Sequence, residues 1–300
     1  MSAEGHVPAP PGDFVLPFDL PAAGVRGRLV RLDASSARAL GVHALSEAAA
    51  RVLGEALALG VLLGTALKLD GRLTVQTKSD GPLDLVAADY YGAEGERAKG
   101  IRGYARLTES SRSNAPTFAE LAGDGSLAIT IEPKTGGQTY QGIVSLSPSG
   151  IAASAETYFA QSEQLPTALR LAAAPLFEAG RSAPSWRAGG MMLQVTPDAK
   201  RCDDDWERLS LILRTVEDLE LVDTSLPAET LLWRLFHEDE VRVLPAEAIA
   251  FRCDCAAARI ATVLKSYSSQ DRAGLADPDG LIRARCEFCG TVHEIAAAVL

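Results

Sequence analysis

Residues 251–255 read Phe-Arg-Cys-Asp-Cys and, after thirty intervening residues, residues 286–290 read Cys-Glu-Phe-Cys-Gly. Two cysteine pairs separated by a loop of this length can bring four thiolates onto one tetrahedral zinc ion. A glycine after the second pair suits the tight turn that points backbone N–H groups at sulfur. The sequence therefore predicts a small carboxyl-terminal zinc domain over residues 248–300, with four ligands: Cys253, Cys255, Cys286 and Cys289.

The segment around these cysteines contains few large apolar side chains, so its own core is thin. Structural zinc contributes roughly 10–16 kcal/mol of apparent binding free energy, which is also folding energy. A purely structural site is the commoner interpretation of four cysteines, but three features favour a redox role. Cys-x-Cys is an unusual first pair for a zinc ribbon. The cysteines of each pair lie close enough in sequence to form a disulfide if an oxidant strips the metal, and the domain directly follows a segment of marginal stability.

That preceding segment is strongly acidic, because residues 198–242 contain thirteen acidic and six basic side chains, a net charge of −7. Apolar residues recur in it at helical spacing, first at Leu209, Ile212, Leu213, Val216 and Leu219, and then, after Pro227, at Leu231, Leu232, Leu235 and Phe236. Amphipathic helices this short are marginal in water and must be ordered by docking on neighbouring domains. We expect residues 198–247 to form a metastable helical linker.

The earlier part of the chain, residues 13–197, has the pattern of an α+β domain with a mixed α/β core. A long apolar helix is predicted from Ser46 to about Leu69, and a shorter one over residues 153–164. Gly60 and Gly64 on the long helix indicate close packing in a core. Strand-like runs occupy residues 25–32, 73–77, 83–88, 101–107, 126–132, 139–146, 169–176 and 191–195, and residues 1–12 are predicted to be a disordered tail.

Composition excludes several classes of protein. The formal charge is −10, from 29 basic and 39 acidic residues, and an acidic surface repels nucleic acid. The most apolar stretch, residues 52–67, is shorter than the roughly 20 residues of a membrane span and is interrupted by Glu55. The start of the chain lacks a signal-peptide pattern. Five cysteines, an odd number, do not suit a disulfide-stapled secreted scaffold, so we expect a cytoplasmic protein without a membrane or nucleic-acid partner.

The spacing of the four cysteines resembles the Hsp33 family of redox-regulated molecular chaperones. Further matches run upstream of the cysteines and extend the resemblance over nearly the whole chain: residues 232–241 (LWRLFHEDEV), 189–194 (GGMMLQ), 162–167 (SEQLPT) and 140–144 (YQGIV). One departure follows Cys255, where residues 256–259 read AAAR in place of a more polar turn. That difference concerns the stability of the zinc domain more than its identity.

The resemblance implies an ATP-independent holdase and not an enzyme. Reduced and zinc-bound, such a protein is inactive. Under oxidative stress, disulfides form within each pair, Cys253 with Cys255 and Cys286 with Cys289. Zinc is then released, the linker unfolds and the protein dimerises. Unfolded client proteins are held until an ATP-dependent, Hsp70-type foldase takes them.

Amphipathic helices that lose their docking surface expose apolar faces suited to unfolded chains. The candidate client-binding residues are therefore those of the linker: Leu209, Leu213, Val216, Leu232, Leu235 and Phe236. Cys202, beside three aspartates in the same segment, has no counterpart in the family pattern, and its simplest interpretation is a spare thiol.

Two alternatives stay open: a zinc-ribbon regulatory protein and a thiol-redox protein. The cysteine-rich region from residue 251 carries six basic and six acidic residues, so it lacks the basic footprint of a nucleic-acid module. His237-Glu238 lacks the second histidine of the HExxH motif of zinc hydrolases. Catalytic CxxC motifs usually begin a helix in a thioredoxin-like βαβ unit, and this pattern is missing from the sequence.

Overall fold

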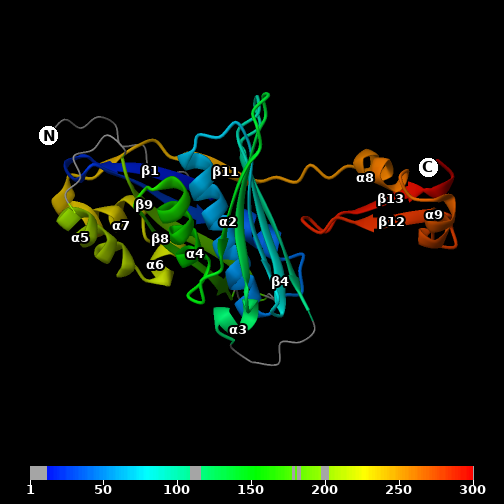
Figure 1. The fold of residues 1–300 in the computed structure, drawn as a ribbon, viewed down its shortest axis with the longest axis horizontal. Helices are drawn as coiled ribbons and strands as arrows, with labels where there is room; N and C mark the ends of the chain where they lie inside the picture. Colours follow the sequence, from blue (N-terminus) through cyan, green and yellow to red (C-terminus); the bar gives the residue numbers. More distant parts are fainter. Residues whose placement is uncertain (1–11, 109–115, 178–179, 181–183, 197–202, 300) are drawn as a thin grey trace. The chain divides into compact units, whose positions relative to one another are not determined.

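The structure is a computed structural model that describes residues 12–108, 116–177, 180, 184–196 and 203–299. The chain divides into two compact units, one ending at Phe251 and the other beginning at Arg252 (Figure 1). Residues 1–11 of the expected disordered tail, and Cys202, lie outside the described residues.

A mixed, curled sheet forms the frame of the first unit. Its strand order is β7-β6-β3-β4-β5-β11-β1-β2-β9-β8, with β10 paired to β1 beside this path. The strands are β1 (Phe14–Leu20), β2 (Val25–Leu32), β3 (Gly71–Ser79), β4 (Leu83–Tyr91), β5 (Lys99–Leu107), β6 (Gly125–Pro133), β7 (Tyr140–Ser145), β8 (Thr167–Leu176), β9 (Ser185–Val195), β10 (Arg242–Val243) and β11 (Glu247–Phe251). Each strand predicted from the sequence is present, and the consecutive strands β6 and β7 pair antiparallel.

Strands β1 and β11 were not predicted, yet they join the two halves of the sheet. Strand β11 pairs in parallel with β5 and antiparallel with β1. Strand β1 is a nearly continuous apolar run interrupted by Pro17 and Asp19, so it lacks the alternation that identified the other strands. Residues 248–251, at the expected start of the zinc domain, belong to β11.

Helix α2 (Glu47–Ala66) occupies one face of the sheet (Figure 1). The Ser46 side chain caps its first turn by accepting a hydrogen bond from the Ala49 amide, and fifteen of its twenty residues are buried. Although α2 is long and apolar enough to cross a membrane, 83% of its apolar window is buried inside the protein. A Cβ atom on Gly64 would lie 2.0 Å from the Tyr90 ring, which confirms the prediction of close core packing. Helix α2 is therefore a core helix.

The opposite face of the sheet carries the acidic segment as three helices, α5 (Asp203–Arg214), α6 (Asp218–Val222) and α7 (Ala228–Phe236). Their apolar side chains form a second core with residues of β1, β2 and β9. The apolar run from Leu209 to Leu219 was predicted as a single helical pattern, and this was wrong, because α5 ends at Arg214. Glu217 then starts α6 with a capping box, so Leu219 points outward and is 67% exposed.

Shorter elements complete the first unit: η1 (Pro21–Ala23), α1 (Ala34–Leu40), α3 (Phe118–Ala122), α4 (Ile151–Tyr158), η2 (Phe159–Glu163) and η3 (His237–Asp239). Helix α4 and the π-helical η2 together account for the helix predicted over residues 153–164.

The second unit contains helices α8 (Ala257–Leu264) and α9 (Ser269–Leu275), the antiparallel hairpin of β12 (Leu281–Arg285) and β13 (Val292–Ala296), and η4 (Ala297–Val299). Its buried apolar cluster consists of Leu264, Ile282 and Ile295. Helix α9 buries none of its side chains. The fold class is therefore a mixed α/β domain followed by a small cysteine-bearing domain, as predicted.

Candidate metal centre

Two turns of the second unit bring the four cysteines together. Cys253 and Cys255 lie in the extended segment before α8, and Cys286 and Cys289 lie in the turn that joins β12 to β13. In that turn the Cys286 amide donates to the Thr291 carbonyl at 2.8 Å, and the Gly290 amide donates to the Cys286 carbonyl at 2.8 Å. Gly290 has φ +71°, a conformation that glycine adopts without steric cost, so the turn depends on it.

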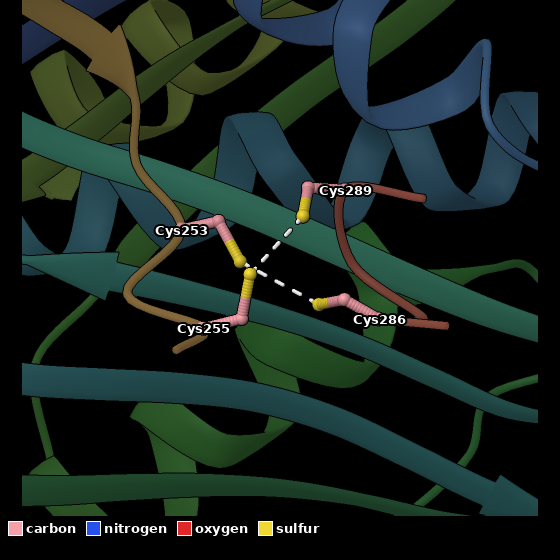
Figure 2. Close-up of side chains that lie close together, drawn as sticks. All are labelled: Cys253, Cys255, Cys286 and Cys289. Carbon is pink, nitrogen blue, oxygen red and sulfur yellow. Dashed lines mark hydrogen bonds between the residues drawn. The ribbon is translucent and has the colours of Figure 1, made fainter. Parts of the chain in front are cut away.

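The four sulfur atoms converge on one point (Figure 2). Cys253 Sγ lies 3.7 Å from Cys286 Sγ, Cys255 Sγ lies 3.4 Å from Cys289 Sγ, and all four atoms lie within 4.8 Å of one another. A tetrahedron of sulfurs about 2.3 Å from a central zinc ion would have edges of about 3.8 Å. The four cysteines could therefore hold a metal ion, and both the donor set and its spacing fit zinc.

The four thiols are electrostatically unequal. Burial and neighbouring sulfurs raise the pKa of Cys255, and burial also raises the pKa of Cys286. Burial acts in the same direction at Cys289, but hydrogen bonds from the side chain and backbone of Thr291 and from nearby thiols outweigh it and lower the pKa of Cys289 to about 6. Without a metal, Cys289 is therefore held as a thiolate more readily than Cys255 or Cys286. Bringing four thiolates together requires a cation between them.

Two polar side chains of the hairpin contact the sulfurs directly. A hydrogen bond of 3.2 Å joins Cys289 Sγ and Thr291 Oγ1, and His293 Nε2 lies 3.3 Å from Cys255 Sγ. From the sequence, His293 lies four residues after Cys289, and with four cysteines already available it is expected to lie beside the site or on the surface and not to be a ligand, whereas Thr291 was missed. Its position two residues after Cys289 was the available signal, because a hydroxyl there can reach back across a tight turn.

The charged residues inside the cysteine pairs have ordinary roles. Asp254 accepts a hydrogen bond from Arg252 Nε at 3.1 Å, and Glu287 is exposed. Both carboxylates add negative charge near the four sulfurs, but neither belongs to the group of candidate metal ligands.

The candidate client-binding residues of the acidic segment are covered in this structure. Leu235 is partly buried, and the other five are at most 1% exposed against the sheet: Leu209, Leu213, Val216, Leu232 and Phe236. The apolar side chains that these helices do expose are Leu211, Leu219 and Trp233. Any contact of the predicted residues with a client would first require the helices to leave the sheet.

The sequence of this chain is similar to proteins of one family. The model of the family described as Hsp33 protein matches residues 13–296. A protein of Caulobacter vibrioides named 33 kDa chaperonin is 37% identical over 292 residues, covering 94% of each chain. The 33 kDa chaperonin of Yersinia pestis strain Pestoides F is 38% identical over 276 residues, covering 92% of this chain and 89% of its own.

A solved structure also has the same fold. The crystal structure of the 33 kDa chaperonin from Thermotoga maritima superposes with a TM-score of 0.76 at 22% identity and covers 95% of each chain. The architecture described above is therefore shared over nearly the full length of both chains.

Proposed function

Because the chain belongs to the Hsp33 family, whose curated relatives here are named chaperonins, we propose that it is a redox-regulated, ATP-independent holdase. It prevents aggregation of unfolded proteins and catalyses no reaction on them. The single observation that carries the redox part of the proposal is the convergence of four cysteine sulfurs within 4.8 Å, in a unit with three buried apolar side chains.

In the reduced protein, Cys253, Cys255, Cys286 and Cys289 serve as the ligands of a zinc ion. Zinc, when bound, keeps the sulfurs as thiolates at neutral pH and supplies roughly 10–16 kcal/mol toward folding of the unit. Cys289 is hydrogen-bonded to the Thr291 hydroxyl, and Cys255 lies within hydrogen-bond distance of the His293 ring. Because a thiolate has no proton to donate, the hydroxyl and the ring would be the donors in the zinc-bound form and would orient those sulfurs.

Oxidation converts this clamp into two disulfides. In each pair, two thiolates, one hydrogen peroxide and two protons give one disulfide and two water molecules. The sulfurs no longer serve as metal ligands, and the small apolar cluster of Leu264, Ile282 and Ile295 cannot keep the unit folded alone. The expected pairing is Cys253 with Cys255 and Cys286 with Cys289.

Loss of this unit frees the acidic segment, whose net negative charge of −7 favours an expanded chain once the helices are undocked. The apolar faces that now lie against the sheet, those of Leu209, Leu213, Val216, Leu232, Leu235 and Phe236, become available to unfolded clients. The oxidised protein acts as a homodimer in the cytoplasm and passes its clients to an Hsp70-type foldase.

The decisive experiment is light scattering of a chemically unfolded client diluted into buffer containing this protein, either reduced and zinc-loaded or oxidised by peroxide under mild heat. Suppression of aggregation by the oxidised form alone is the expected result. Cys286→Ser removes one sulfur of the cluster and should abolish the difference between the two forms. Cys202→Ser is the matched control, because it removes a cysteine outside the pairs.

The other outcomes separate the alternatives. Suppression by both forms would mean that the acidic segment is already released and no redox switch operates. Failure of both forms would contradict the holdase proposal and return the cysteine unit to a structural zinc ribbon or a thiol-redox role.

A further inference from the structure

The end of helix α6 is held on the sheet by a buried arginine, Arg31 of strand β2. Arg31 is 4% exposed, although its neighbours in sequence are core residues of the opposite face. Its side chain therefore points to the face that carries the acidic segment. A buried guanidinium requires several hydrogen-bond acceptors, and in this protein the acidic segment supplies them.

Three backbone carbonyls accept hydrogen bonds from Arg31. Its Nε donates to the Leu221 oxygen at 3.2 Å, Nη2 to the Glu220 oxygen at 3.0 Å and Nη1 to the Leu226 oxygen at 2.5 Å. The last carbonyls of a helix have no partner within the helix, and its carboxyl end attracts a cation. Arg31 thus ties the end of α6, and the loop that leads to α7, to the sheet.

The strand partner of Arg31 makes room for this contact. Gly189 of β9 pairs with Arg31 across the sheet. A Cβ atom on Gly189 would lie 2.6 Å from the Leu221 oxygen, closer than such atoms can approach. The first glycine of the sequence GGMMLQ at residues 189–194 is therefore required by the close approach of α6, which accounts for part of a motif that the cysteine chemistry does not explain.

A second arginine holds the other end of α6. Arg170 Nε of β8 donates to the Val216 oxygen at 2.9 Å, and Arg170 Nη2 contacts Asp218 at 2.6 Å. Burial lowers the pKa of Arg31, and the carboxylates of Asp223 and Glu229 partly oppose that shift by favouring its charged form. Backbone carbonyls and an acidic side chain of the acidic segment thus bind two arginines of the sheet, Arg31 and Arg170.

We propose that Arg31 and Gly189 form a latch that holds α6 on the sheet and sets how readily the acidic segment is released. The proposal rests on the proposed function only in assigning this release to activation. Exposing an apolar contact to water costs free energy, whereas backbone carbonyls released from Arg31 form new hydrogen bonds with water. The contacts of Arg31 therefore fix one docked position of α6 but allow α6 to leave the sheet at a modest cost.

The test is hydrogen exchange of the reduced, zinc-loaded full chain, followed by mass spectrometry of peptides covering residues 217–226. Arg31→Met removes the donors while keeping an unbranched side chain, and Gly189→Ala adds one methyl group beneath Leu221. Both should accelerate exchange in this region at least about tenfold, since hydrogen bonds to a charged group are lost or α6 is displaced. Arg26→Met, which changes an exposed arginine on the same strand, is the matched control and should change nothing.

Unchanged exchange at residues 217–226 in both variants would overturn the latch. If Arg31→Met accelerates exchange throughout the first unit, Arg31→Lys decides the question, because it retains the charge but cannot make all three contacts. Acceleration confined to residues 217–226 in Arg31→Lys supports the latch, and uniform or absent acceleration overturns it.

Aggregation assays distinguish this result from the proposed function. Arg31→Met should reach full suppression of client aggregation at a lower dose of peroxide than the unmodified chain. If the oxidised, unmodified chain fails to suppress aggregation at all, the holdase proposal is wrong, while the exchange data still decide whether Arg31 and Gly189 hold α6.

Discussion

The two units of the chain are stabilised by different means. The first unit contains two extended apolar clusters, one on each face of its sheet, and the second contains three buried apolar side chains beside four cysteines. Apolar burial in the first unit does not depend on sulfur–metal bonds, whereas the second unit, under the proposed function, loses its support when its cysteine sulfurs react. If the proposed function holds, this difference places the oxidant sensitivity of the protein in its smallest core.

A second contrast exists within the first unit. Helix α2 is buried over most of its surface, whereas α5, α6 and α7 bury one face each, and arginines of the sheet hold the two ends of α6. Both sets of helices pack on the same sheet. Local stability follows the number of buried apolar contacts, so the acidic helices should open before α2 does.

Of the changes considered, removal of the metal should produce the largest difference in stability between the two units. Chelation of zinc from the reduced protein should unfold residues 252–299, because it withdraws roughly 10–16 kcal/mol of binding free energy from a thin core. Hydrogen exchange should then show loss of protection in β12 and β13, with strands β3 and β6 of the first unit still protected. Retained protection of β12 and β13 without metal would mean that the small apolar cluster is sufficient.

Buried charge on the acidic helices should have the next largest effect. Leu213→Asp combined with Val216→Asp places two carboxylates against an apolar sheet face, where the native side chains are at most 1% exposed. The docked state should lose on the order of 5 kcal/mol, so α5 should exchange rapidly even in the reduced protein. Client capture by the oxidised form should weaken, and zinc content should stay the same.

The matched control uses the exposed side of the same helices. Leu211 and Leu219 are 56% and 67% exposed, so Leu211→Asp with Leu219→Asp should leave docking unchanged. Undiminished capture by the Leu213 and Val216 variant would place the client surface elsewhere on the molecule.

A cavity in α2 should act on the whole first unit. Leu59 is fully buried in the core on the α2 face, and Leu59→Ala should lower the free energy of unfolding by about 2–5 kcal/mol, as measured by urea denaturation. Leu211→Ala, on the exposed face of α5, should change it by less than about 0.5 kcal/mol. A similar loss in both variants would contradict the assignment of Leu59 to a tightly packed core and of Leu211 to the surface.

Much of this architecture was predictable because its signals are local in sequence. Residues 126–132 carry Leu127, Ile129 and Ile131 in alternation, a local pattern that predicts β6, and Ser46 before an apolar run predicts the start of α2. The spacing of the cysteines likewise placed two pairs in one small domain. Each of these signals depends on a few neighbouring residues.

The features that escaped prediction depend on pairing between distant segments. Strand β11 joins β5 and β1 across long separations in sequence, and nothing in its five residues specifies either partner. Arg31 reads as one of three arginines in a strand until the register places it opposite Gly189. Thr291 becomes significant only when the turn brings its hydroxyl to Cys289. These contacts arise from how distant strands pair and how the turn folds, and no local sequence pattern specifies them.

The smallest expected effect concerns Glu55, a carboxyl of α2 on the side toward the acidic segment. Burial, together with the negative charge of Asp218, raises the pKa of Glu55 from 4.5 to about 7, against the opposing effect of Arg170 and Arg51. The folded protein thus binds this proton more tightly than the unfolded chain does. The associated stability is fully present below about pH 4.5 and is lost as the pH rises through 7.

Glu55→Gln should therefore remove a fall in stability on the order of 2 kcal/mol between pH 5 and pH 8, measured as urea midpoints of the reduced protein across that range. Glu47→Gln, at an exposed position on the same helix, is the control and should retain the fall in stability.

Hydrogen exchange at residues 217–226 shows whether the charge of Glu55 acts on the acidic segment, because Asp218 lies in α6. Slower exchange there at pH 8 in Glu55→Gln would mean that the charge on α2 opposes docking of the acidic segment, which would make the two faces of the sheet energetically coupled. An identical pH dependence in Glu55→Gln and the unmodified chain would instead leave α2 and the acidic helices as independent regions.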